Sequence, residues 1–100
     1  MNIQITSRKF RAKDSLNDFI KDELNQLTKY NSDILDANVV LSFLHNENSI
    51  KSAEITLMVP GKTFSAEDSS DEFRKAIGGA IDKLERQLRK LKTKRLAKAR

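Results

Sequence analysis

The hydrophobic period of the chain changes once within residues 1–30. Residues 2–7 alternate between apolar and polar positions, with Ile3 and Ile5 on one side, and this pattern predicts a half-buried strand. Residues 14–30 instead place apolar side chains at helical spacing, which predicts an amphipathic helix. We expect Asp14 to cap that helix, because its carboxylate can accept hydrogen bonds from the free N–H groups of the first turn.

Alternation returns in the middle of the chain. Residues 37–45 and 51–59 both place apolar side chains at every second position, so two further strands are expected. The dipeptide Pro60-Gly61 follows, and it predicts a tight type II-like turn because Pro presets φ and Gly supplies a positive φ. A fourth strand is then expected over residues 62–67, and the last three strands form an antiparallel meander.

The longest periodic segment opens the last third of the chain. Ser69 and Glu72 stand three positions apart in a capping-box pattern, which predicts the start of a helix. The apolar stripe of this helix reaches Leu91, so we expect the helix to end near residue 92 and to fray into a basic tail, residues 93–100. The stripe consists of Phe73, Ile77, Ala80, Ile81, Leu84, Leu88 and Leu91.

The predicted order of elements is β-α-β-β-β-α. Each strand has one apolar face and both helices are amphipathic, so the economical packing places both helices on one face of a four-stranded sheet. This is an α+β fold. We expect residues 1–92 to form one domain, followed by the basic tail.

Positive charge is concentrated at the end of the chain, whose net charge is +5. Residues 71–100 contain eleven Lys or Arg and four acidic residues, whereas residues 1–70 contain eight and ten. A mildly acidic body with a strongly basic end should attract a polyanion, and nucleic acid is the commonest large polyanion that proteins meet.

The cations of the second helix gather on one side of a helical wheel. The ridge opposite the apolar stripe consists of Lys75, Lys83, Arg86 and Lys90, with Arg89 and Lys92 at its flanks. Like charges at these spacings repel each other and lower the stability of the helix. The excess of cations over acidic residues therefore favours a polyanionic partner over a merely solvated surface. A membrane-surface helix is disfavoured because the sheet needs the apolar stripe. The ridge lacks aromatic residues, so we expect recognition of folded RNA by backbone and shape.

Two consecutive glycines, Gly78 and Gly79, interrupt this helix. Each costs roughly 1 kcal/mol relative to Ala in a helix interior, so the pair predicts a weakened and slightly bent helix. Alternatively, the missing side chains allow close approach of another backbone, either a strand below or an RNA phosphate above.

The sequence does not favour an enzyme. It has no cysteine, no metal-ligand spacing, no phosphate-binding glycine loop and no base partner for a Ser or Thr nucleophile. His45, the single histidine, is interpreted as a surface residue at the edge of the polar loop His45–Ser49. We therefore predict no catalytic residue, metal, cofactor or small-molecule substrate. No apolar run could span a membrane and no signal peptide is visible, so a cytoplasmic protein is expected.

Four segments together carry a resemblance to a known family. They are Leu16-x-x-Phe19-Ile20, Lys29-Tyr30, Val39-Val40-Leu41 and, most specifically, Ile81-Asp82-Lys83-Leu84-Glu85-Arg86-Gln87-Leu88-Arg89-Lys90. With the element order, they resemble the ribosome hibernation promoting factor family, also called the sigma-54 modulation or ribosome-associated inhibitor family. One departure is Lys13, which stands where that family often has a Thr that caps the first helix.

The resemblance implies a protein that binds the small ribosomal subunit (16S rRNA) in the channel between head and body. It would occupy the path of messenger RNA and the tRNA sites and silence idle ribosomes. The rRNA contacts implied for this chain are Lys83, Arg86, Arg89, Lys90 and Lys92, with Lys75 and the connector cations Arg8, Lys9 and Arg11 as further candidates. The length resembles that of short members without a C-terminal dimerisation domain, and we expect a monomer when free.

Two alternatives stay open at this point. The first is a generic binder of structured RNA that acts away from ribosomes. The second is a protein-interaction adaptor, such as a modulator of a transcription sigma factor.

Overall fold

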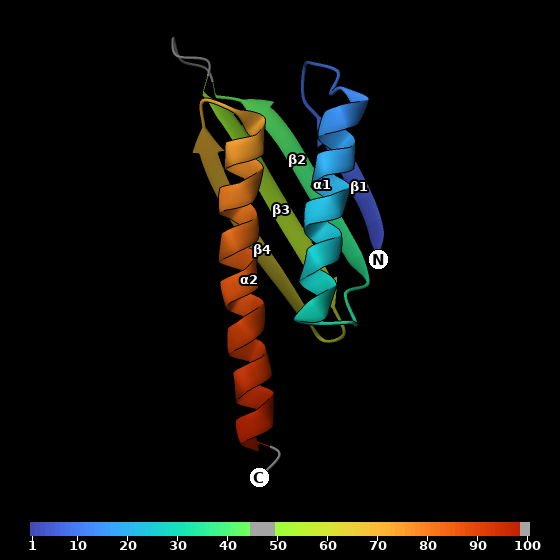
Figure 1. The fold of residues 1–100 in the computed structure, drawn as a ribbon, viewed down its shortest axis with the longest axis vertical. Helices are drawn as coiled ribbons and strands as arrows, with labels where there is room; N and C mark the ends of the chain where they lie inside the picture. The colour runs from blue at the N-terminus through green and yellow to red at the C-terminus, as the bar shows by residue number, and fades with distance from the viewer. Residues whose placement is uncertain (45–49, 99–100) are drawn as a thin grey trace.

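The computed structural model describes the backbone of residues 1–44 and 50–98 and the side chains of those up to Leu91. The elements are β1 (Asn2–Ser7), α1 (Asp14–Gln26) with a 3-10 turn η1 (Leu27–Lys29), β2 (Asp36–Phe43), β3 (Lys51–Val59), β4 (Lys62–Ser70) and α2 (Phe73–Lys98). The predicted β-α-β-β-β-α order and the α+β class are confirmed (Figure 1). The predicted polar loop with His45 lies outside the described residues.

The four strands form one mixed sheet in the order β1-β2-β3-β4. Helix α1 carries the chain back along the sheet, so β1 and β2 are parallel, while β2, β3 and β4 form the predicted antiparallel meander. The turn between β3 and β4 contains Pro60 and Gly61, and Gly61 has a φ of 79°. That left-handed value is what a type II turn requires at its third position.

Both helices lie on the same face of the sheet (Figure 1), and the core fills the space between. Alternate strand residues such as Val39 and Ile55 meet helix residues such as Leu24, Ile77 and Leu84, and all five are fully buried. Burying one such side chain contributes about 1.5–3 kcal/mol. The apolar stripe of α2 is thereby fixed against β3 and β4, and the opposite side of α2 faces away from the sheet.

Both predicted helix caps are wrong. Lys13 occupies the cap position of α1, no side chain caps this helix, and Asp14 is already its first residue. Asp14 therefore acts on the helix through its charge near the N-terminus alone. Ser69 cannot cap α2, because β4 continues to Ser70, which is paired with Lys51.

Helix α2 extends to Lys98 instead of ending near residue 92. Residues 92–98 contain Lys, Arg, Leu, Ala and a single Thr, without Gly or Pro, so helix propensity is enough to continue the backbone pattern beyond the last core residue. Figure 1 shows the end of α2 projecting past the sheet. The division into a domain of residues 1–92 and a separate tail stays a prediction.

Neither of the described helices combines the length and the apolar composition that a membrane span requires.

Candidate nucleic-acid interface

Arg86 and Lys90 form the most open part of the basic side of α2. Both are exposed, and neither makes an ion pair with another residue that the structure describes. They are four positions apart, so their Cα atoms are separated by about 6 Å along the helix axis and the two side chains stand on adjacent turns. Their two positive charges are therefore available to an external anion.

Lys83 is held by the edge of the sheet. Its Nζ donates a hydrogen bond of 2.7 Å to the carbonyl oxygen of Glu67 and lies 3.9 Å from a carboxylate oxygen of Asp68. One turn later, the side-chain amide of Gln87 donates to the carbonyl oxygen of Ser65 at 3.2 Å. Both carbonyls belong to the edge strand β4, so the two side chains occupy acceptors that another strand could otherwise pair with. Lys83 thus has a structural role that its position on the helical wheel did not reveal.

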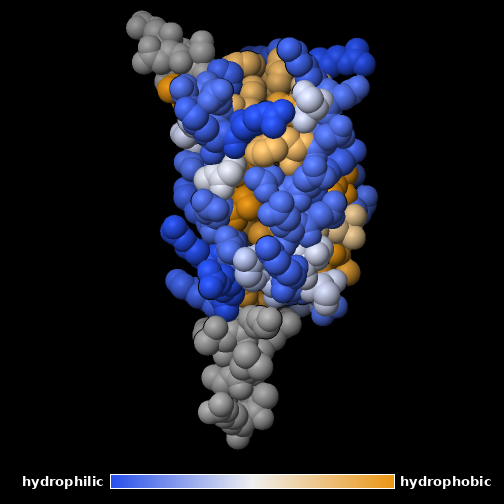
Figure 2. Space-filling model, viewed as in Figure 1, coloured by the Kyte–Doolittle hydropathy of each residue, from blue (hydrophilic) through white to orange (hydrophobic). Residues whose placement is uncertain are grey.

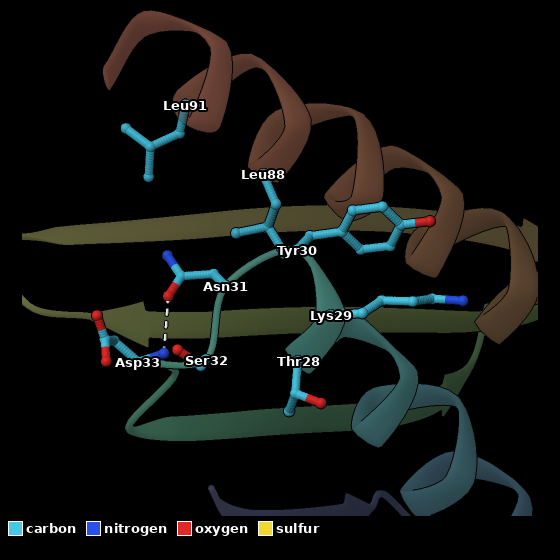
Figure 3. A pocket seen from close by; sticks show the side chains of 8 residues that line it. All are labelled: Thr28, Lys29, Tyr30, Asn31, Ser32, Asp33, Leu88 and Leu91. Carbon is cyan, nitrogen blue, oxygen red and sulfur yellow. Dashed lines mark hydrogen bonds between the residues drawn. The ribbon is translucent and has the colours of Figure 1, made fainter. Parts of the chain in front are cut away.

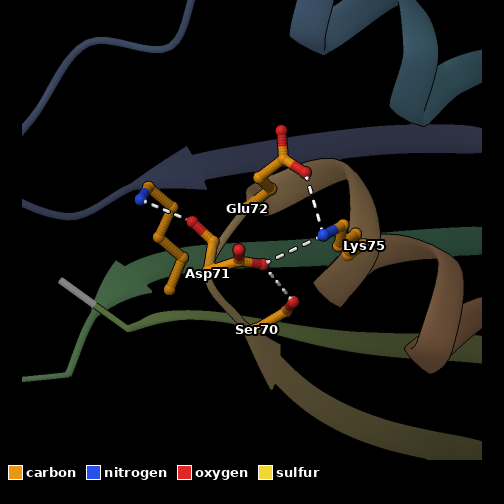
Figure 4. Close-up of polar contacts among 5 residues, drawn as sticks. Ser70, Asp71, Glu72 and Lys75 are labelled. Carbon is orange, nitrogen blue, oxygen red and sulfur yellow. Dashed lines mark hydrogen bonds and ion pairs between the residues drawn. The ribbon is translucent and has the colours of Figure 1, made fainter. Parts of the chain in front are cut away.

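Lys75 is already paired with acidic residues (Figure 4). Its Nζ lies 3.4 Å from a carboxylate oxygen of Asp71 and 3.3 Å from one of Glu72. The hydrogen bond with Glu72, followed by that with Asp71, raises the pKa of Lys75. The hydroxyl of Ser70 donates to Asp71 at 3.0 Å, and this bond together with Lys75 lowers the pKa of Asp71. Lys75 therefore offers less uncompensated charge to RNA than Arg86 does.

Arg89 pairs with Glu85, which also contacts Tyr30 of the segment after α1. Its Nη1 lies 3.9 Å from Oε1 of Glu85, and the same oxygen accepts a hydrogen bond of 2.5 Å from the hydroxyl of Tyr30. This hydrogen bond is the main cause that raises the pKa of Tyr30. The side chain of Arg89 is nevertheless 67% exposed, so it still borders the surface that carries Arg86.

The segment that follows α1 runs beside the second half of α2 (Figure 3). Between them lies a hollow of about 290 Å³ that the polar turn after Tyr30 shares with Leu88 and Leu91. The turn is closed by Asn31, whose side-chain oxygen accepts the backbone N–H of Asp33 at 2.8 Å. Across the described part of the chain, no three His, Cys, Asp or Glu side chains lie close enough to hold a metal.

The connector cations lie at the other end of the molecule. Arg8, Lys9 and Arg11 are exposed and belong to the segment between β1 and α1, at the end of the sheet where α2 begins (Figure 1). The connector is fixed by a hydrogen bond of 2.9 Å from the N–H of Arg8 to the carbonyl oxygen of Leu41. Lys9 has a φ of 64°, a left-handed conformation that is strained for a side chain of this size.

The predicted contact residues therefore divide into two groups. Lys83, Arg86, Arg89 and Lys90 share about two turns of α2. Lys75 and the connector cations lie toward the start of α2, and about 22 Å of helix separates Lys75 from Lys90. Lys92 lies within α2, but its side chain is outside the described part.

Gly79 accommodates a side chain from β4. A Cβ atom at this position would lie 1.7 Å from a carboxylate oxygen of Asp68, whereas one at Gly78 would meet nothing within 4 Å. The close approach that the sequence allowed for is real at Gly79, but its partner is the Asp68 carboxylate instead of a backbone or a phosphate. Asp68 in turn lies beside Lys83.

Sequence reasoning missed the aromatic residues at the sheet end. Phe10, Phe43 and Phe73 meet there from three distant segments, with ring centroids 5.0–5.4 Å apart. A signal was present in the run Arg8-Lys9-Phe10-Arg11, which interleaves a ring with cations. Arg74 was missed as well, and its guanidinium lies 4.7 Å from the ring centroid of Phe19.

A family model described as "Sigma 54 modulation protein / S30EA ribosomal protein" matches residues 3–96. The chain belongs to this family. The resemblance seen in the sequence is therefore confirmed.

Two curated relatives carry the name "Ribosome hibernation promotion factor". The one from Deinococcus radiodurans is 33% identical over 93 residues, and the alignment covers 91% of this chain and 49% of the relative. The one from Staphylococcus aureus is 30% identical over 81 residues, covering 81% and 43%. The chain thus spans about half the length of the curated relatives it matches.

Two solved structures share the fold over nearly their whole length. The Protein Y N-terminal domain from Thermus thermophilus superposes with a TM-score of 0.81 at 30% identity, covering 91% of this chain and 99% of that one. A ribosomal subunit interface protein from Coxiella burnetii gives a TM-score of 0.83 at 24% identity, covering 93% and 99%. At that identity, the second match speaks for the fold alone.

Proposed function

We propose that the protein is a ribosome hibernation factor of the cytoplasm that binds the small ribosomal subunit and inhibits translation in idle or stressed cells without catalysing a reaction. The observation that carries this proposal is the exposed, unneutralised pair Arg86 and Lys90 on a helix of this family. The names of the relatives from Deinococcus and Staphylococcus support it.

The proposed contact is electrostatic. Cations on α2 lie against phosphates of 16S rRNA in the channel that messenger RNA and tRNA use, and the folded body obstructs both. Each neutralised phosphate releases counterions, so the logarithm of the binding constant should fall by about 0.7–0.9 per contact for each tenfold rise in salt. Arg86 and Lys90 contribute most, because Lys83 must leave the carbonyl of Glu67 before it can reach a phosphate.

The proposal is tested by reversing charge at the open pair. The Arg86→Glu/Lys90→Glu variant should lose cosedimentation with purified small subunits while its circular dichroism stays that of the unchanged protein. Lys21→Glu/Lys62→Glu is the matched control, because it makes the same change in net charge at exposed residues of α1 and β4. The control should bind like the unchanged protein, and cosedimentation of both variants alike would contradict the proposal.

The two alternatives predict other results in the same system. A generic binder of structured RNA would be displaced from small subunits by an equal mass of free duplex RNA, whereas a hibernation factor would not. A sigma-factor modulator would retain a protein partner in a pull-down after nuclease treatment, and it would tolerate the Arg86→Glu/Lys90→Glu change.

A further inference from the structure

Three phenylalanine rings form a cluster, which we call the aromatic trio, at the end of the sheet where α2 begins. Phe10 and Phe73 stack with centroids 5.0 Å apart and planes at 14°. Phe43 stands nearly perpendicular to both, at 5.1 and 5.4 Å. The first two rings are half-buried, but Phe43 is 45% exposed, and Leu44 beside it is 41% exposed. The strand alternation that buries Leu41 thus continues past the edge of the core.

Positive charge surrounds the aromatic trio. Phe10 is flanked in the connector by four cations, Arg8, Lys9, Arg11 and Lys13. All four side chains are exposed, and none of them makes an ion pair with a described residue. Two further cations touch rings of this region, since Lys51 lies 5.7 Å from the centroid of Phe43 and Arg74 lies over Phe19. The acidic residues nearby, Asp71 and Glu72, are occupied by Lys75.

A hollow of about 400 Å³ adjoins the aromatic trio, which is within the size range of pockets that hold small molecules. Its walls include Phe10 and Phe73, the connector residues Arg11 and Lys13, and the acidic residues Asp71 and Glu72. Phe43 does not line the hollow itself but packs against the Phe10 and Phe73 rings that do. Figure 2 shows hydrophobic surface between the two helices at this end of the molecule, framed by hydrophilic side chains. Apolar ring surface bordered by uncompensated cations is complementary to a nucleotide, whose base is flat and apolar on its faces and whose phosphate is anionic.

We propose that the aromatic trio and the connector cations form a subsite for one unpaired nucleotide of RNA. The base stacks against the exposed ring of Phe43, and its phosphate lies on Arg11 and Lys13. This inference rests on the proposed function for the identity of the RNA, but its chemistry differs from that of α2. The cations of α2 bind phosphates of the RNA backbone, whereas the subsite at this end of the sheet binds a base that is not paired in an RNA duplex.

Binding to defined RNA separates the two chemistries. The probe is a short single-stranded RNA of mixed sequence, compared with a blunt RNA duplex of the same length, and both are titrated into the full chain. Phe43→Ala should weaken single-strand binding about tenfold and leave duplex binding within about twofold, because stacking on an aromatic side chain is lost only for unpaired bases. Phe43→Tyr keeps the ring and should bind both probes like the unchanged protein. Equal effects of Phe43→Ala on the two probes, or no effect on either, would overturn the proposal.

A fluorescent variant reports stacking directly. The chain contains no tryptophan, so Phe43→Trp introduces a single fluorophore at the subsite. Single-stranded RNA should quench its emission, while an abasic RNA oligonucleotide of the same length should bind the cations without quenching. Quenching of the same size by the abasic probe would contradict base stacking. If the unchanged protein were a dimer and Phe43→Ala made it a monomer, the surface would be a contact between two copies and the proposal would fail.

The same variants distinguish failure of the subsite from failure of the proposed function. Arg86→Glu/Lys90→Glu, combined with Phe43→Trp, should abolish cosedimentation with small subunits but keep the base-dependent quenching. Loss of cosedimentation with no quenching in any protein would reject the subsite alone. Retained cosedimentation with normal quenching would reject the proposed role of α2 and leave the subsite standing.

Discussion

The hydroxyl of Tyr30 donates a hydrogen bond of 2.5 Å to Oε1 of Glu85. The two residues are 55 positions apart, and their contact joins the residue that follows η1 to the middle of α2. Glu85 is also the ion-pair partner of Arg89, so one carboxylate holds the two helices together and orients a cation of the proposed interface. Through this contact, the packing of the two helices and the presentation of charge depend on each other.

This hydrogen bond predicts a specific loss of stability at alkaline pH. The bond to Glu85 raises the pKa of Tyr30 in the folded state, so its stabilising effect is complete below the ordinary tyrosine pKa and is lost as the pH rises through the folded value. The Tm of the unchanged protein should therefore fall more steeply than that of Tyr30→Phe, which has no phenol to ionise, as the pH rises above about 10. If the Tm values of the two proteins fell equally with pH over this range, the bond would have no such role.

The two glycines of α2 predict different responses to the same substitution. Gly78→Ala should raise the free energy of unfolding by about 0.5–1 kcal/mol, because Ala is the better helix former and its Cβ meets open space. Gly79→Ala should give less than this or lower stability, because its Cβ displaces the carboxylate of Asp68 from the neighbourhood of Lys83. Denaturant unfolding measures both. Asp68→Ala removes the side chain that a Cβ at position 79 would meet. Relative to Asp68→Ala, the double variant Gly79→Ala/Asp68→Ala should therefore gain as much stability as Gly78→Ala gains relative to the unchanged protein.

Lys83 should show separable effects on stability and on RNA binding. Lys83→Gln can still donate a hydrogen bond toward the carbonyl of Glu67 but has no charge, whereas Lys83→Met loses both. We expect Lys83→Gln to melt close to the unchanged protein and Lys83→Met to melt lower, while both lose affinity for small subunits and about one unit of salt slope. Unfolding curves and salt titrations supply the two readouts. Full affinity in Lys83→Gln would mean that this charge stays on β4 in the complex.

Lys9 offers a substitution in which stability and binding move in opposite directions. Lys9→Gly relieves a left-handed conformation and should stabilise the fold by up to about 1 kcal/mol, although the added freedom of the unfolded chain offsets part of this. The same change removes one connector cation and should weaken binding to single-stranded RNA. Arg11→Gln is the control, since it removes a cation without changing the backbone. Weakened binding by Arg11→Gln but not by Lys9→Gly would restrict the role of the connector to Arg11.

The sequence was sufficient for the elements whose side chains enter the core. The alternation of Ala53, Ile55, Leu57 and Val59 and the helical spacing of Ile77, Leu84 and Leu88 predict their elements because one face of each must be buried. The ends of elements were predicted less well. Ser69 has the composition of a cap, but pairing of β4 with β3 holds it in a strand.

The candidate site could be predicted as a charged face but not as a set of contacts. Helical spacing places Lys83, Arg86 and Lys90 on one side, and it says nothing about which of them reaches a neighbour. Lys83 contacts Glu67 because the packing of α2 on the sheet brings this part of the helix beside β4. The helical spacing of the sequence carries no information about that packing. The aromatic trio was hidden for the same reason, since its rings come from positions 10, 43 and 73.

The most direct test of the central claim is the affinity for purified small ribosomal subunits, measured for the unchanged protein, for Arg86→Glu/Lys90→Glu and for the control Lys21→Glu/Lys62→Glu. Large subunits serve as the reference ligand in the same buffer. The account predicts saturable binding of the unchanged protein and the control to small subunits only, and a loss of at least about tenfold for the Arg86 and Lys90 variant. Equal affinities of the three proteins for small subunits would contradict it.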